Sequence, residues 1–177
     1  MEWYVLFVEN GKEEIVKRYI QLHFDEHSIY PIVPKRKVPE KKAGIVYPVL
    51  KKIFPGYVLI KTNMNGLIFR KIREIPRCYR LVNSGLYYSK EKGTYYSKID
   101  EKEVELLLRL LENGEIIEYS KIHFENSDFF VKSGPLKEME FIIKKIDKRK
   151  NRAKIILNLL GTEQTIDVGI EITSEFN

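Results

Sequence analysis

The chain has 177 residues, with 31 Lys and Arg against 25 Asp and Glu, a net charge of +6 and a pI near 9.2. This length suits one ordinary domain or two small ones, and an apolar content of 44% excludes wholesale disorder. The sequence has no apolar run of the ~20 residues that a bilayer crossing needs, no signal-peptide pattern at its start, and a single cysteine, Cys78, which excludes a disulfide framework. We therefore expect a cytoplasmic protein.

The first part of the chain alternates strand-like and helix-like segments. The apolar and aromatic run Trp3–Val8 predicts a buried strand. Apolar residues then recur at helical spacing between Ile15 and His23, which predicts a helix. Ser28–Val33 resembles a second strand. The Pro- and Lys-rich stretch Pro34–Lys52 is expected to be a loop rather than a regular element.

The same alternation continues beyond this stretch. Tyr57–Thr62 predicts another strand, and Asn65 is suited to cap a helix whose apolar face ends at Ile75. Residues 77–98 contain five tyrosines without a clear period, so we expect one short strand and irregular loop there.

The sequence predicts a third helix from about residue 100. Asp100 and Glu103 have the spacing of a capping box, in which two side chains satisfy backbone N–H groups at the helix start. A stripe of apolar residues at helical spacing follows, and Gly114 is a suitable C-terminal stop.

The last part of the chain has a different character. From Asp128 onward there is no helical stripe, only four short strand-like runs: 128–132, 141–146, 153–160 and 165–170. Four or five strands in ~50 residues fit a small β-barrel, which avoids exposed edges. The fold class is therefore expected to be α+β, with an α/β sandwich-like domain over 1–112, a linker over 113–127 and a β-barrel over 128–177.

The motifs of common enzyme and metal sites are missing from the sequence. It contains no Gly-rich phosphate loop, no Gly-x-Ser-x-Gly turn and no His-based metalloprotease motif. His23 and His27 have helical spacing, but no third metal ligand has a recognisable spacing to them. Because Cys78 has no histidine nearby in sequence, a small core residue is a better interpretation than a nucleophile. We expect no catalytic residues, metal or cofactor.

Positive charge is concentrated in two clusters. Each has seven cationic side chains and one acid, a net charge of +6, so the rest of the chain is acidic. A single cluster of this kind is best explained as a solvated turn, but two clusters in separate elements favour binding to a polyanion, for example a nucleic acid. The candidate RNA-binding residues are Lys35, Arg36, Lys37, Lys41, Lys42, Lys51 and Lys52 in the first cluster, and Lys144, Lys145, Lys148, Arg149, Lys150, Arg152 and Lys154 in the second.

Several motifs, in order, resemble a known family. Trp3-Tyr4-Val5, Phe54-Pro55-Gly56-Tyr57, and then Ser133-Gly134-Pro135-Leu136 with the strands after it are similar to the NusG family of transcription elongation factors. The resemblance implies a NusG N-terminal (NGN) domain followed by a KOW domain. The basic segments 34–37 and 148–154 and the segment 114–118 are most similar to LoaP, a specialised antitermination branch of the family. Phe141 departs from the pattern, because the KOW motif usually has glycine there.

The resemblance implies two partners. The first domain would dock on the clamp helices of RNA polymerase through an apolar patch, and the residues that match by motif position are Trp3, Tyr4, Phe54 and Tyr57. By binding one polymerase conformation preferentially, it would suppress pausing and termination. The second partner would be an RNA hairpin in the leader transcript. There Arg149 and Arg152 are the best candidates for specificity, because guanidinium groups pair bidentately with phosphate or guanine.

Two other functions stay open at this point. One is a housekeeping NusG-like elongation factor without RNA preference, whose KOW domain contacts a protein. The other is a stand-alone RNA-binding protein in which only the barrel is functional. In each case we expect a monomer that does not bind membranes.

Overall fold

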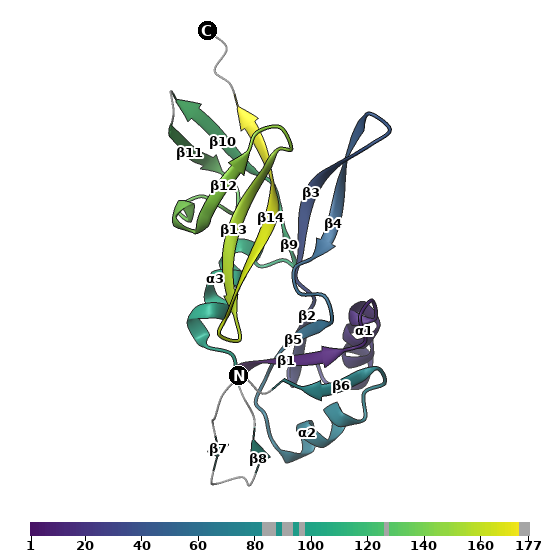
Figure 1. Ribbon diagram of the computed structural model, residues 1–177. Coiled ribbons are helices and arrows are strands. Elements are labelled where there is room, and N and C mark those ends of the chain that lie inside the picture. The colour runs from purple at the N-terminus through teal and green to yellow at the C-terminus, as the bar shows by residue number, and fades with distance from the viewer. Residues whose placement is uncertain (83–87, 90–93, 96–97, 126–127, 174–177) are drawn as a thin grey trace. The chain divides into compact units, whose positions relative to one another are not determined.

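The computed structural model describes residues 1–82, 88–89, 94–95, 98–125 and 128–173. These residues form two compact units (Figure 1). Unit 1 consists of Met1–Val33 and Phe54–Val104, and unit 2 consists of Pro34–Ile53 and Glu105–Asn177. Residues 34–53 lie inside the first domain that the sequence predicts, but in the structure they group with the C-terminal part of the chain.

Unit 1 is built on a four-stranded sheet with the strand order β2-β5-β1-β6, in which each neighbouring pair is antiparallel. Its strands and two helices are β1 (Glu2–Val8), α1 (Glu13–His23), β2 (Ile29–Ile32), β5 (Tyr57–Thr62), α2 (Gly66–Arg73) and β6 (Cys78–Leu81). The strands and helices that the sequence predicts in this region are therefore confirmed, within one to three residues at their ends.

The core of unit 1 lies on one face of this sheet. Tyr4, Leu6 and Val8 project from alternate positions of β1 into an apolar cluster that includes Val16 and Ile20 from α1. Helix α2 starts as predicted, because the Asn65 side chain accepts hydrogen bonds from the N–H groups of its first turn. None of the helices in the described part of the chain has the length and apolar character needed to cross a bilayer.

The described part of the tyrosine-rich stretch contains three short strands, where the sequence predicts one. The first is β6, which belongs to the unit 1 sheet, and β7 (Tyr88–Ser89) pairs with β8 (Thr94–Tyr95) in a separate two-stranded sheet that was not predicted. The predicted loop falls partly on residues 83–87, 90–93 and 96–97, which lie outside the described residues.

The stretch Pro34–Lys52 is a β-hairpin, so its prediction as a loop is wrong. Strands β3 (Lys35–Lys42) and β4 (Ile45–Lys52) pair along their whole length through a two-residue turn, Ala43 and Gly44, both with positive φ. In such a hairpin the pair next to the turn is hydrogen-bonded and the pairs alternate from there. Pro39 and Pro48 face each other at a non-hydrogen-bonded pair, where the ladder needs no N–H, so neither proline breaks the strands.

Helix α3 (Glu101–Leu111) starts where the capping pattern predicts it. The Asp100 carboxylate accepts a hydrogen bond of 2.8 Å from the N–H of Lys102. The helix ends through positive φ angles at Glu112 and Asn113 rather than at Gly114. After it, β9 (Ile116–Ile117) joins the hairpin as a parallel neighbour of β3, which gives a three-stranded sheet in the order β4-β3-β9.

The largest sheet of unit 2 has five strands in the order β11-β10-β14-β13-β12. They are β10 (Ser120–Glu125), β11 (Asp128–Ser133), β12 (Ile143–Asp147), β13 (Arg152–Leu159) and β14 (Thr162–Thr173). The four runs predicted from Asp128 onward all contribute strands. The fifth strand, β10, lies in the stretch predicted as a linker, where it pairs in parallel with β14, a contact 50 residues away that local pattern does not reveal.

Phe141 lies in a short 3₁₀ helix, Glu140–Ile142, that leads directly into β12. Its side chain is exposed, and its backbone does not have the positive φ that favours glycine. A side chain is therefore accommodated where the KOW motif usually has glycine.

Candidate binding surfaces

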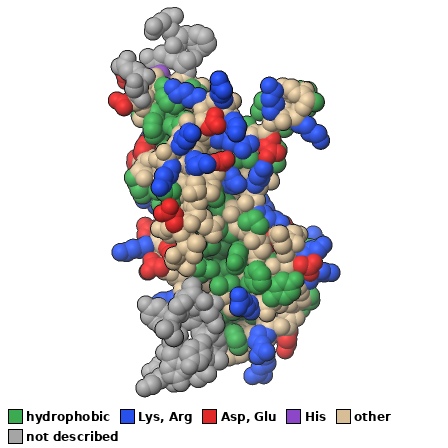
Figure 2. All heavy atoms as spheres, viewed as in Figure 1, with side chains coloured by type: hydrophobic (Ala, Val, Ile, Leu, Met, Phe, Trp, Pro, Cys, Tyr) green, Lys and Arg blue, Asp and Glu red, His purple; other side chains and the backbone are tan. Residues whose placement is uncertain are grey.

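Unit 1 carries an aromatic patch on the sheet face that points away from its core. Phe7 and Tyr57 are cross-strand partners whose ring centroids lie 5.6 Å apart, and the Tyr79 ring lies 5.5 Å from Phe7 on the other side. The Arg80 guanidinium lies 5.7 Å from the centroid of the Phe7 ring. Tyr79 is 62% exposed, and hydrophobic side chains gather visibly on this part of unit 1 (Figure 2). We call Phe7, Tyr57 and Tyr79 the aromatic patch.

Trp3 lies on the same face of β1 but belongs to a different contact. Its ring meets that of Tyr30 edge-on at 6.5 Å, and Lys61 Nζ lies 5.7 Å from its centroid. Val5 lies between Trp3 and Phe7 on this face and is buried. The aromatic side chains therefore form two separate contacts along β1.

The four residues selected by motif position do not lie on one surface. Tyr4 is only 4% exposed and belongs to the core of unit 1, and Phe54 is only 3% exposed. Neither ring is accessible for direct contact with a partner. The prediction that Tyr4 and Phe54 contact the polymerase is therefore corrected. Trp3 and Tyr57 are partly exposed on the face opposite the core.

Sequence reasoning missed two members of the aromatic patch. The alternation of β1 could have identified Phe7, because residues 3, 5 and 7 must share one face of a strand. Tyr79 could not be found this way, since its place depends on β6 pairing with the far edge of β1.

A buried hydrogen bond holds the turn that leads to Tyr57. Gly56 has φ of +83°, a conformation that glycine adopts without strain. Its N–H donates to the Glu13 carboxylate at 2.7 Å, and its carbonyl accepts from Val8 N–H at 2.8 Å. The turn is thereby attached to both α1 and β1, which fixes the start of β5 and with it the aromatic patch.

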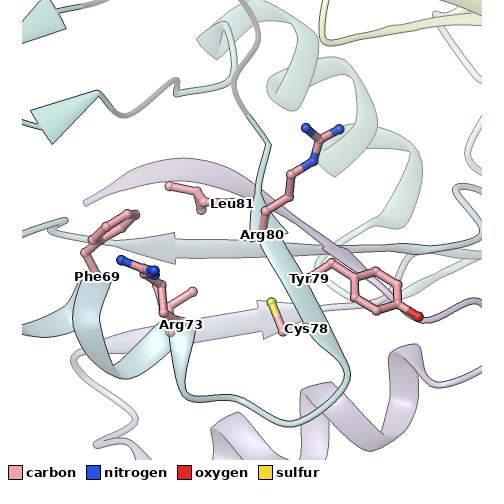
Figure 3. Close-up of a pocket in the computed structure, with 7 residues that line it drawn as sticks. Phe69, Arg73, Cys78, Tyr79, Arg80 and Leu81 are labelled. Atoms are coloured by element: carbon pink, nitrogen blue, oxygen red, sulfur yellow. The ribbon is translucent and has the colours of Figure 1, made fainter.

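A pocket of about 440 Å³ lies between α2 and β6 in unit 1. Figure 3 shows that the guanidinium groups of Arg73 and Arg80, which line it, point away from each other rather than converging on a common point. Cys78 also lines it, and burial raises the pKa of this thiol to about 11. This geometry provides neither an anion-binding site nor an activated nucleophile.

In the first basic cluster, several cations are engaged within unit 2. The Arg36 guanidinium donates to the Asp167 carbonyl, and its burial lowers its pKa. Lys37 Nζ lies 2.9 Å from the Glu118 carboxylate, and Lys51 pairs with Glu40. Lys41 and Lys42, beside the hairpin turn, are exposed. The hairpin's charges thus serve mainly to attach β3 and β4 within unit 2.

Arg152 in the second cluster is also a structural residue. Its Nη2 and Nε atoms donate to the Pro39 carbonyl at 2.6 and 3.2 Å, and Nη1 lies 3.6 Å from an Asp167 carboxylate oxygen. With a side chain only 20% exposed, it joins β13 to the β3–β4 hairpin. Its interpretation as a specificity residue for RNA is therefore corrected.

The remaining cations of the second cluster face solvent. In Figure 2, Lys and Arg side chains gather over the part of unit 2 that contains β12 and β13. Lys148 Nζ lies 3.6 Å from the centroid of the Phe124 ring. The exposed members of this cluster are Lys144, Lys145, Lys148, Arg149, Lys150 and Lys154. We call these six residues the basic face.

His23 and His27 make local contacts, whereas His123 Nδ1 lies 2.9 Å from the Thr173 carbonyl oxygen. His23 Nδ1 lies 2.9 Å from the Tyr19 carbonyl and its ring stacks on that of Tyr19, whereas His27 lies 3.7 Å from Glu26. Among the described residues, His, Cys, Asp and Glu side chains form no group of three that could hold a metal ion.

Comparison with known proteins gives one consistent family. The family model described as "Transcription termination factor nusG" matches residues 1–108. The chain is 25% identical over 172 residues to the transcription termination/antitermination protein NusG of Vibrio cholerae and 27% identical to that of Pasteurella multocida. These alignments cover 94% of this chain and 91% and 90% of the two relatives.

A solved structure has the same fold. It is described as "Domain interaction in Thermotoga maritima NusG", and it matches with a TM-score of 0.56 and 23% sequence identity. The match covers 95% of this chain and 93% of that one, so the likeness of fold extends over both units.

Proposed function

The chain belongs to the NusG family of transcription termination and antitermination factors, and on that premise we propose that it is a processive antiterminator of the LoaP type. In this proposal unit 1 acts as an NGN domain that binds RNA polymerase, and the five-stranded sheet of unit 2 acts as a KOW barrel. A hairpin in the nascent leader transcript recruits the protein, which then promotes read-through of terminators.

The observation that carries the polymerase part is the aromatic patch. Phe7, Tyr57 and Tyr79 present three adjacent, at least partly exposed rings on the sheet face opposite the core, with Arg80 beside them. Exposed aromatic groups flanked by an arginine are typical of the central contacts in protein interfaces. The proposed partner surface is the pair of clamp helices, and preferential binding to the closed clamp would suppress pausing.

The patch is tested by the Tyr79→Ala variant in a polymerase-binding assay. Tyr79 is exposed, so its truncation should leave the fold intact while it weakens binding by a factor of about 10 or more. Leu22→Ala, which removes an exposed apolar side chain from α1, is the matched control and should bind normally. Equal binding by both variants would exclude the patch as the docking site.

The RNA part of the proposal rests on the basic face. Its cations project from β12, β13 and the turn between them, while Arg36 and Arg152, the other arginines of the two clusters, are engaged within the protein. Arg149 therefore remains the best candidate for guanidinium recognition of the hairpin. Lysines around it would supply attraction that does not depend on sequence.

A salt series with leader hairpins and unrelated duplexes tests recruitment. Specific recruitment requires that one leader hairpin binds more tightly than the duplexes at every salt concentration, and that Arg149→Ala removes this preference. If all RNAs bind equally, the protein is a general elongation factor. If RNA binds but polymerase does not, the protein is a stand-alone RNA-binding protein.

A further inference from the structure

An aromatic pair lies beside the basic face, on β10 and β11. Phe124 and Phe129 are cross-strand partners with ring centroids 6.2 Å apart, and both rings are partly exposed. Two pairs further into the sheet, and so on the same face, Ile122 and Val131 are buried. The phenylalanine pair therefore lies at the solvent-exposed end of the apolar face of β10 and β11.

One ring face of this pair is covered by a long polar side chain rather than by core residues. Lys148, from the turn between β12 and β13, is exposed and holds its ammonium group 3.6 Å from the Phe124 ring centroid. A cation–π contact at an exposed site is weak, so the lysine can leave the ring at small cost. The ring and the cation together offer a planar apolar surface with a positive charge beside it.

Strand alternation keeps the nearby acids away from these rings. Glu125 and Asp128 form the next pair along the two strands, so they project to the opposite face. Asp147, the last residue of β12, accepts a hydrogen bond of 3.0 Å from the Lys150 N–H and so caps the turn. The ring face is thus bordered by the cations of the turn, which favours an anionic ligand with a planar apolar group.

We infer that Phe124 and Phe129 form a stacking site for one unpaired RNA base, with Lys148 moving from the ring to the adjacent phosphate. The inference rests on the proposed binding of RNA by the basic face. The basic face alone would contact the phosphates of a continuous duplex as well as those of a bulged one. Stacking on the phenylalanine pair adds a requirement, because it needs a base that lies outside the helix. The RNA recognised here would therefore carry a bulged or looped-out base near the contacted phosphates.

The test uses the full chain and two synthetic RNA hairpins that differ only in one bulged 2-aminopurine. We expect the bulged hairpin to bind about 10-fold more tightly than the fully paired one, with a change in 2-aminopurine fluorescence on binding. Phe124→Leu and Phe129→Leu should abolish both effects and leave the affinity for the paired hairpin unchanged. Leucine keeps apolar volume at the end of the core, and a thermal melt checks that each variant is folded.

Phe130→Leu is the matched control. Phe130 is 43% exposed and pairs with His123 on the opposite face of the same two strands, so its loss should not affect the preference for the bulged hairpin. The plot of log affinity against log salt has a negative slope, and Lys148→Gln should make it less steep by about 0.7–0.9 for the bulged hairpin.

The outcomes separate this inference from the proposed function. If both hairpins bind with the same affinity and a normal salt dependence, RNA binding stands and the stacking site is overturned. The stacking site is also overturned if Phe130→Leu and Phe124→Leu behave alike. If neither hairpin binds, the proposed RNA recruitment and the stacking site both fail.

Discussion

Glu13, at the first position of α1, accepts a hydrogen bond of 2.7 Å from the backbone N–H of Gly56, 43 residues later in the chain. The carboxylate is fully buried, and it holds the turn that starts β5. Because Tyr57 follows this turn directly, the buried Glu13 side chain helps to position the aromatic patch.

Replacement of Glu13 should therefore destabilise unit 1. Glu13→Ala leaves the buried Gly56 N–H unpaired, and we expect a loss of about 1–3 kcal/mol in the free energy of unfolding. Glu13→Gln keeps an acceptor oxygen and should lose less. Trp3 is the only tryptophan and lies in β1, so its fluorescence during urea unfolding reports on unit 1. Equal stability of Glu13→Ala and the exposed-site variant Glu14→Ala would contradict this role.

Gly169 in β14 should not tolerate a side chain. A Cβ atom there would lie 2.7 Å from the Lys37 carbonyl oxygen and would overlap the Tyr119 ring, so β3 would have to shift. We expect Gly169→Ala to destabilise unit 2 by about 1–3 kcal/mol, measured by urea unfolding followed by circular dichroism. Gly66→Ala is the control. It has open space and an ordinary φ at the start of α2, so it should be neutral or slightly stabilising.

Arg152 should contribute to stability rather than to RNA recognition. Arg152→Ala removes the two hydrogen bonds to Pro39, and we expect it to cost about 1.5–3 kcal/mol. Amide hydrogen exchange in β3 and β4 should become faster. Arg149→Ala, three residues away on the exposed turn, should change stability by less than about 0.5 kcal/mol. Unchanged exchange in Arg152→Ala would show that the hairpin is held by its other contacts.

The hairpin turn offers a stabilising substitution. Ala43 has φ of 51°, a left-handed conformation that costs an ordinary residue about 1–2 kcal/mol, and Asn-Gly is the preferred pair for such a turn. Ala43→Asn should therefore raise the melting temperature, with a gain of about 0.5–1 kcal/mol. Gly44→Ala, at φ of 85°, should lower it. The opposite order of the two variants would contradict the turn geometry.

Cys78 should react slowly with alkylating reagents. Burial raises its pKa to about 11, so at pH 8 only about one thiol in a thousand is ionised, compared with roughly one in ten at the ordinary value of 9.0. Reaction with iodoacetamide should accelerate as the pH rises from 8 towards 11, because only the thiolate reacts. Free cysteine serves as the reference, and an equal rate at pH 8 would contradict the shift.

Local patterns were sufficient for the four-stranded sheet of unit 1, its two helices and the start of α3. The apolar run of β1, the Asn65 cap of α2 and the Asp100 cap of α3 each specify a neighbouring segment, and all are confirmed. The β3–β4 hairpin was missed because its proline and lysine content suggests a loop. The information was nevertheless present, since the Ala43-Gly44 turn places Pro39 opposite Pro48, where their missing N–H groups do not matter.

The candidate surfaces were less predictable than the fold. Motif position selected Tyr4 and Phe54, yet whether a ring is buried depends on which face of the sheet the helices cover. Charge counting found both basic clusters, but it could not show that Arg149 is exposed whereas Arg152 is held by contacts within the protein. Only the approach of Pro39, more than a hundred positions earlier in the chain, reveals that one arginine is engaged and the other exposed.

The β3–β4 hairpin has a consequence for synthesis of the chain. Its anchor, Arg36, leaves the ribosome 131 residues before Asp167, and Arg152 follows Pro39 by 113 residues. The strands of the unit 1 sheet, by contrast, are all translated by residue 81. During translation Arg36 and Pro39 therefore lack these hydrogen-bond partners until β13 and β14 emerge. Unit 2 therefore cannot be completed before β14 has been translated, whereas the unit 1 sheet can form earlier.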